Sequence, residues 1–199
     1  KWLIQMGGKD AVFARAYLLS TWNLICRTEN TSLICHKHFL WRSDAVGIPF
    51  AHEKTNQEGD SRKTKPRHCY PNPLDPYVCL LTGVFEYMAC FPQLLEERDG
   101  LLFPGESQND RFAGILKDLL LLDEKAVTEM GCKIGDLLGP HSIQKGGTTY
   151  LTSGSTSGPT VSSVNIRGGW SHNTVRDVYM LYEKAGDQYC GRILAGLPV

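Results

Sequence analysis

Side chains able to do chemistry are concentrated in the last third of the chain. His141, Gln144 and Lys145 follow one another at steps of three and four residues from His141, so a helix there places them on one side. Trp170 precedes Tyr179 by nine residues. A tyrosine hydroxyl can act as a nucleophile that forms a covalent intermediate, and an imidazole can carry protons. These residue types fit a group transfer in which fixed donors stabilise the developing negative charge.

Two stretches between residues 139 and 197 resemble a known family, in the same order along the chain. They read GPHSIQKGGTTYLTSGSTSGP and NIRGGWSHNTVRDVYMLYEKAGDQYCGRILAGLP. Both resemble the catalytic domain of tyrosine recombinases, the phage-integrase-like enzymes that break and rejoin DNA, and most closely the Crypton-type recombinases of eukaryotic mobile elements. An earlier stretch, AYLLSTWNLICRTENTSLICHKHFLWRSDAVGIPFAHEKTNQEGD, is similar to the first box and the lysine hairpin of that family. The resemblance implies DNA cleavage and rejoining through a 3′-phosphotyrosyl intermediate.

The resemblance assigns a nucleophile and two cations. Tyr179 is the expected nucleophile, with Tyr182 and Tyr189 as rivals on the same segment. Arg27 is expected to clamp the phosphate, because a guanidinium fork matches phosphate oxygens. Lys54 corresponds to the hairpin lysine, which donates a proton to the departing 5′ oxygen. Lys63 or Lys65 could substitute for it.

The remaining candidate catalytic residues are His141, Gln144 and Trp170. His141 corresponds to the family histidine that handles protons, and Trp170 stands where many relatives have histidine. Gln144 is a departure, because the family pattern there is His-x-x-Arg. A glutamine brings neither charge nor a bidentate fork, and losing one such stabiliser typically costs on the order of 100- to 1,000-fold in rate. Lys145 could compensate in part.

A basic run after the Lys54 loop is the candidate DNA-binding surface. Its members, with Lys145 added, are Arg62, Lys63, Lys65, Arg67 and Lys145. Such residues would contact the DNA backbone and contribute salt-dependent affinity rather than sequence choice. A solvated surface loop is the alternative. Arg167 and Arg176, which flank Trp170, are weaker candidates for DNA contact.

The hydrophobic pattern predicts elements that could position these residues. Apolar residues recur at helical spacing over residues 10–26, ending beside Arg27. Residues 31–40 and 45–50 alternate as two strands, and further helices are expected over 76–91, over 109–130, from residue 141 and over 173–185. We therefore expect an α+β fold, mostly α: a tyrosine-recombinase-like helical bundle with a small antiparallel sheet near the N-terminus.

Composition narrows the class of protein. Lys+Arg and Asp+Glu are balanced at 21 each, so the net charge of zero does not indicate nucleic-acid binding. The apolar runs are too short to span a bilayer. Seven cysteines form no C-x-x-C pair, which favours a reducing interior, and Cys26, Cys79 and Cys90 are expected to be buried thiols. Residues 35–38 (Cys-His-Lys-His) alternate between strand faces and have no second ligand pair, so they indicate structure rather than zinc binding.

The expected organisation is a recombinase-like catalytic domain over residues 1–185 and a tail over 186–199 that could dock onto a neighbouring subunit. The family's N-terminal DNA-clamp domain is expected to be missing. The resemblance implies duplex DNA as partner, a homotetramer on DNA, a nuclear location, and no metal or other cofactor. One alternative is a domesticated recombinase fold that binds DNA or a protein without cutting. Another is a helical interaction domain unrelated to DNA.

Overall fold

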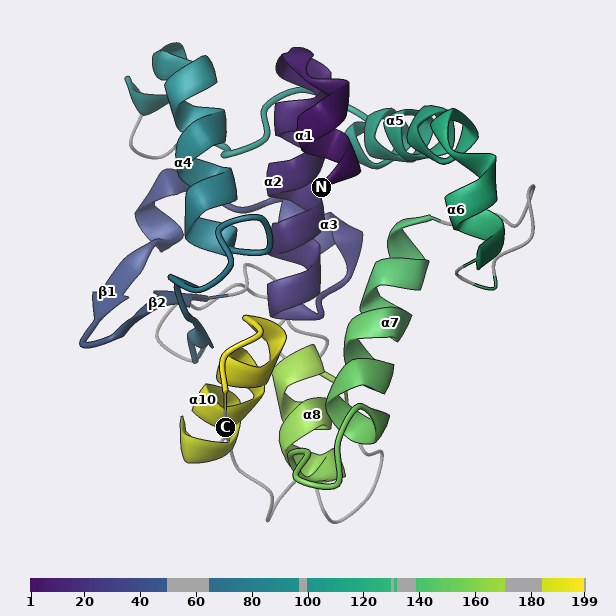
Figure 1. The fold of residues 1–199 in the computed structure, drawn as a ribbon. Coiled ribbons are helices and arrows are strands. Elements are labelled where there is room, and N and C mark those ends of the chain that lie inside the picture. Colours follow the sequence, from purple (N-terminus) through teal and green to yellow (C-terminus); the bar gives the residue numbers. More distant parts are fainter. Residues whose placement is uncertain (50–64, 97–99, 130, 132–138, 171–183, 199) are drawn as a thin grey trace.

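One long helix forms the centre of the protein. The computed structural model describes residues 1–49, 65–96, 100–129, 131, 139–170 and 184–198, and the chain is mostly helical there (Figure 1). Helix α2 (Gly8–Leu24) runs through the middle, and Phe13, Ala14, Tyr17 and Leu24 on it are fully buried. A helix that is covered on all sides needs apolar residues around its circumference, not along one stripe. The helix predicted over 10–26 is apolar around its circumference because it is covered on all sides.

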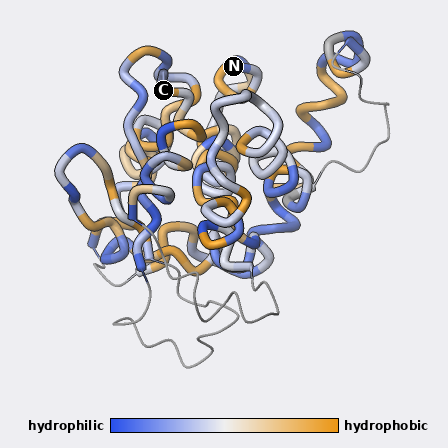
Figure 2. Tube along the Cα trace, turned by 90° about the horizontal axis from the view of Figure 1, so that it is seen from below, coloured by the Kyte–Doolittle hydropathy of each residue, from blue (hydrophilic) through white to orange (hydrophobic). Residues whose placement is uncertain are grey.

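Other helices pack around α2. They are α1 (Trp2–Met6), α4 (Leu80–Cys90), α5 (Gln108–Leu122) and α7 (Pro140–Ser153). Helix α4 comes close because Gly83 has no side chain: a Cβ there would lie 2.7 Å from the Cδ1 atom of Leu19. Hydrophobic and hydrophilic residues alternate around the helices (Figure 2), as expected for elements with one face against the interior.

The predicted helix over 109–130 is two helices. Helix α5 ends at Leu122, and Asp123 has non-helical backbone angles before α6 (Glu124–Glu129) begins. The predicted helix over 76–91 is shorter at its start, with α4 beginning at Leu80 and a 3-10 turn, η2 (Pro92–Leu95), following it. Asp75 accounts for the later start, because its side chain accepts the backbone N–H of Tyr77 in a turn.

The sheet has three antiparallel strands in the order β1-β2-β3. They are β1 (Leu40–Arg42), β2 (Ala45–Ile48) and β3 (Arg67–Cys69), with Trp41 opposite Val46 and Val46 opposite Cys69. The expectation of a mostly helical fold with a small antiparallel sheet near the N-terminus is confirmed. Strand β3 was not predicted, because prolines close to it on both sides are typical of a loop.

The predicted strand over 31–40 is wrong for most of its length. The chain forms helix α3 (Thr28–Ser32) and a 3-10 turn, η1 (His36–His38), before β1 begins. The buried Thr31 hydroxyl lies 3.1 Å from the Thr21 hydroxyl on α2, so a tertiary contact holds this residue in a helix. Packing against α2 therefore overrides the β propensity of the threonines and isoleucine.

Two further helices complete the C-terminal part. They are α8 (Val161–Gly168) and α10 (Lys184–Leu194); in Figure 1 α8 lies beside α7, and α10 lies beside α8. The predicted boundary at residue 185 falls inside α10. Cys190 and Leu194 of α10 are buried against the same chain, so this face is already occupied without a neighbouring subunit. The rest of the predicted helix over 173–185 lies outside the described residues.

The burial of the cysteines differs from the prediction at one position, Cys90. Cys26 and Cys79 are buried as predicted, but Cys90 is exposed at the end of α4. It is the last residue of α4, beyond Tyr87, the last buried residue of that helix. In the part of the chain that the structure describes, no helix combines the length and hydropathy that a membrane span requires.

Candidate functional site

The C-terminal end of α2 is where the candidate site begins. The backbone of Ile25 is left-handed, with φ of 42°, and its N–H donates to the carbonyl of Trp22. A β-branched residue pays a steric penalty in this region, so the surroundings must hold it there. Ile25 is fully buried. The turn ends the helix and delivers Arg27, which is exposed, to the first position before α3.

Helix α7 is fastened to this turn by Gln144. The side-chain Nε2 of Gln144 donates to the backbone carbonyl of Ile25 at 3.0 Å. The helices can approach because residue 147 is glycine: a Cβ there would lie 2.9 Å from the Cγ2 atom of Ile25. His141 and Lys145, one helical turn from each other on α7, are both exposed. His141 and Gln144, two of the predicted catalytic residues, therefore lie on the helix that contacts the turn before Arg27.

Trp170 packs against the buried cluster that includes Ile25. Helix α8 ends at Gly168, and Gly169 follows with a left-handed backbone, φ of 68°, that suits glycine. The backbone N–H of Trp170 then donates to the backbone carbonyl of Asn165 at 3.0 Å. The indole packs against a buried cluster that contains Ile25 and Leu151 of α7. Gln144 thus contacts the turn itself, two residues before Arg27, and Trp170 packs against the buried cluster to which Ile25 belongs.

Several predicted site residues lie outside the described part of the chain. They are Lys54, Arg62, Lys63, Arg176, Tyr179 and Tyr182. Tyr189, a rival for the nucleophile, lies on α10, and its hydroxyl donates to the carbonyl of Ser157. Their predicted roles stay predictions. Lys65 is described and exposed, immediately before β3.

Arg67 was expected to contact DNA, but the structure places it in the interior. It is 2% exposed, and its guanidinium donates to the carbonyls of Arg167 at 2.8 Å and Ile166 at 2.9 Å. These carbonyls belong to the last turn of α8, where the helix has unsatisfied acceptors and a negative dipole end. Arg67 is therefore used to cap α8, and we remove it from the DNA-binding set.

Arg167, a weaker candidate for DNA contact, is fully buried. Its guanidinium donates to the carboxylate of Asp187 at 2.6 Å and to the backbone carbonyls of Asn23 at 2.7 Å and His68 at 3.0 Å. The residue joins α8 to α10, to β3 and to the end of α2. Each of these bonds is charge-assisted. Arg167 therefore holds elements together and is not available to a phosphate.

Asp187 completes this buried network. Its second carboxylate oxygen, Oδ2, accepts the backbone N–H of His68 at 2.8 Å and lies 2.8 Å from the Nδ1 atom of the same histidine. Burial alone would raise the pKa of Asp187. The charge of Arg167 and the hydrogen bonds from His68 outweigh it and hold the pKa below its usual range. Asp187 is therefore an anion in the folded protein at neutral pH.

The network was missed in the sequence, although one signal was present. Asp187 precedes Cys190, Gly191 and Leu194 by three, four and seven residues, and all four are buried on α10. A carboxylate in phase with the apolar face of a helix indicates a buried ion pair, because an unpaired buried charge is too costly. The same phase relates Arg167 to Val164 on α8, three residues earlier.

Metal binding has no support within the described residues. They contain no group of three or more His, Cys, Asp or Glu side chains close enough to share an ion. The Cys-His-Lys-His run lies in η1, where the Nδ1 atom of His38 accepts the backbone N–H of Cys35 at 3.1 Å. His38 is thus used in a local turn.

Comparison with known proteins gives no family. No family model matches the chain, and neither a curated protein nor a solved structure matches it. The geometry itself is a solvent-exposed arginine after a strained turn, with a helix carrying an exposed histidine and lysine fastened beside it. The assignment to a function must therefore come from the residues and their arrangement.

Proposed function

We propose that this chain is a tyrosine-recombinase-like catalytic domain that cleaves and rejoins duplex DNA through a 3′-phosphotyrosyl intermediate at Tyr179. The observation that carries the proposal is the bond from Gln144 to the backbone carbonyl of Ile25, two residues before Arg27, while Trp170 packs against the buried cluster to which Ile25 belongs. Gln144 and Trp170 come more than a hundred residues after Arg27 in the sequence. The motif resemblance alone selected them, so the bond from Gln144 to the turn before Arg27 supports it.

The chemistry fits this arrangement. The exposed Arg27 can donate two parallel hydrogen bonds to phosphate oxygens. His141 is exposed on α7, the helix that contacts the turn before Arg27, and its imidazole can move a proton. The tyrosine hydroxyl displaces the 5′ oxygen of the DNA and keeps the 3′ phosphate, and Lys54 is proposed to protonate that oxygen. The reverse attack restores the phosphodiester. We expect the reaction to take place in the nucleus, in a tetramer on paired sites.

One observation favours a second function, a DNA-binding module that does not cut. Gln144 occupies the position of the second arginine, and its amide nitrogen already donates to the Ile25 carbonyl. A neutral side chain engaged with the backbone gives less stabilisation to a phosphate transition state than a guanidinium does. The fold would then present Arg27, Lys65 and Lys145 to the DNA backbone without completing cleavage.

A covalent-trapping assay separates the two functions. The full chain is incubated with a nicked suicide duplex, from which the cleaved end is lost, and protein–DNA adducts are counted on a denaturing gel. We expect an adduct in the wild type, none in Tyr179→Phe, and an unchanged adduct in the control Tyr189→Phe. Salt-sensitive binding without any adduct would establish the binding module instead. An adduct that survives Tyr179→Phe would assign the nucleophile to another tyrosine.

Replacing Gln144, the residue that differs from the family pattern, tests the site directly. We expect Gln144→Arg to raise the rate of adduct formation by on the order of 100-fold, because it restores a charged, bidentate donor. The control is Gln5→Arg, at an exposed residue on α1 where the added charge stays in solvent. An unchanged rate in Gln144→Arg, in a protein that still forms the Tyr179 adduct, would mean that residue 144 does not face the phosphate.

A further inference from the structure

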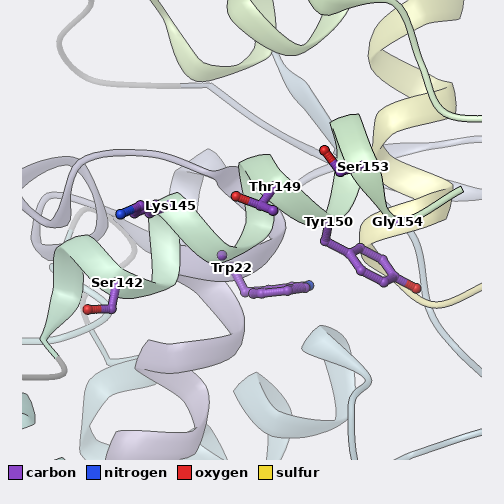
Figure 3. Close-up of a pocket in the computed structure, with 8 residues that line it drawn as sticks. Trp22, Ser142, Lys145, Thr149, Tyr150, Ser153 and Gly154 are labelled. Carbon is purple, nitrogen blue, oxygen red and sulfur yellow. The ribbon is translucent and has the colours of Figure 1, made fainter. Parts of the chain in front are cut away.

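A cavity of about 640 Å³ opens on the flank of α7 next to Lys145. Figure 3 shows its lining: Trp22 of α2 lies on one side, and Ser142, Lys145, Thr149 and Tyr150 project from α7. Its volume is within the roughly 300–1,000 Å³ of sites that bind small molecules. Of the predicted site residues, Lys145 alone lines this cavity, and it was predicted to bind DNA.

Two aromatic rings form one wall. The rings of Trp22 and Tyr150 are 5.7 Å apart between centroids and tilted by 46°. The indole Nε1 of Trp22 donates to the Leu194 carbonyl at 3.0 Å, which fixes the orientation of the ring. Tyr150 is 45% exposed. Gly146 faces the indole with no side chain, and a Cβ there would be 3.5 Å from Cζ3 of Trp22. An aromatic surface is therefore left uncovered.

The remaining wall is cationic and hydroxylic. Ser142, Lys145, Thr149 and Ser153 follow one another at steps of three and four residues, so they form one stripe along α7. Lys145 and Thr149 are exposed. Among the described residues that line the cavity, the only charge is positive. Hydroxyl groups and an ammonium beside an aromatic wall match the phosphate and the base of a nucleotide.

We propose that this cavity binds an unpaired nucleotide of the DNA substrate, with the base against Trp22 and Tyr150 and its phosphate at Lys145. This proposal rests on the proposed function, which supplies DNA as the ligand. It adds a preference for DNA that carries an extrahelical base. His141 and Lys145 lie within one turn of α7. The unpaired base would therefore lie close to the phosphate that is cleaved. An apolar peptide is a poorer occupant, because it would leave Lys145 and the hydroxyl stripe without partners.

The test compares two duplexes of the same sequence, one fully paired and one with a single unpaired thymine, by fluorescence anisotropy at fixed salt. We expect the wild type to bind the bulged duplex on the order of tenfold more tightly. Tyr150→Ala and Gly146→Leu, which remove the ring or fill the cavity, should abolish this preference and keep the affinity for the paired duplex. Tyr77→Ala and Gly114→Leu are the controls: Tyr77 is 47% exposed outside the cavity, and Gly114 on α5 has open space around its Cα.

Each outcome decides the proposal. Equal binding of the two duplexes by the wild type overturns the nucleotide site and leaves the proposed function standing, because paired DNA is still bound. A preference that survives both cavity variants also overturns it. Failure to bind either duplex overturns the site and the proposed function together. Circular dichroism of Gly146→Leu checks folding, and Tyr150→Ala provides the second variant should the filled cavity unfold the protein.

Discussion

The buried ion pair between Arg167 and Asp187 allows a sharp test of the fold. Asp187→Asn keeps the size of the side chain and removes its charge. The Arg167 guanidinium, with its side chain fully buried, would then have only neutral acceptors. Removing one partner of a buried pair typically costs about 3–5 kcal/mol, because the other charge remains without compensation. We therefore expect Asp187→Asn to lower the free energy of unfolding by about 3–5 kcal/mol, a large share of the roughly 5–15 kcal/mol that folded domains possess.

The chain supplies a matched control at its surface. Asp44 pairs with Arg192, but the two side chains are 54% and 43% exposed. Exposed pairs contribute about 0–1 kcal/mol, so Asp44→Asn should have little effect. Urea denaturation followed by circular dichroism at pH 7 measures both variants. With a slope of about 2 kcal/mol per molar urea, the midpoint for Asp187→Asn should fall by about 2 M. Equal midpoints for the two variants would refute the reasoning.

The effect should also depend on pH. The folded-state pKa of Asp187 lies below its ordinary value of 3.8, so the carboxylate contributes stability above that pH. This contribution is lost as the pH falls through the lower, folded-state value. The difference in stability between wild type and Asp187→Asn should therefore be constant near neutrality and shrink below about pH 4. A difference that stays the same in acid would assign the cost to packing rather than to charge.

Two further predictions concern buried positions. Burial raises the pKa of the Cys69 thiol to about 12, so a thiol reagent at pH 8 should label the exposed Cys90 in the native protein and Cys69 only after unfolding. Rapid native labelling of Cys69, read by peptide mass spectrometry, would contradict its burial. Gly191→Ala should destabilise by at least about 1–3 kcal/mol, because the new Cβ would lie 2.2 Å from the His68 carbonyl oxygen. Gly114→Ala, in open space on α5, should instead raise the melting temperature, and the same direction of shift in both variants would refute this account.

The sequence predicted the helices better than it predicted the strands. The apolar stretch over 10–26 predicts α2 to within two residues at each end, since a long, strongly apolar segment has few alternatives to a buried helix. The predicted strand over 31–40 failed because Thr31 bonds to Thr21 on α2, a contact that no local pattern contains. Strand β3 is three residues long, and its pairing with β2 depends on a partner far back in the chain.

The candidate site was predicted unevenly for a related reason. The family resemblance selected Arg27, Gln144 and Trp170; Gln144 bonds the Ile25 carbonyl two residues before Arg27, and Trp170 packs against the cluster that contains Ile25. It misassigned Arg67, since a basic run next to prolines is typical of an exposed loop. The difference between a solvated arginine and a buried one depends on Asp187 and on the carbonyls of α8, which come 100 or more positions later. Charge alone does not reveal such a partner.

The long separation between the members of this network has a consequence for biosynthesis. Asn23 and Arg167 are 144 positions apart, and His68 and Asp187 are 119 apart. At a translation rate of about 5–20 residues per second, the nascent segment around His68 waits on the order of ten seconds before Asp187 emerges from the ribosome. During that interval the arginine beside it has no helix end to cap, and the cysteine that follows it is uncovered. Strand β3 therefore reaches its native surroundings only after α10 has left the ribosome.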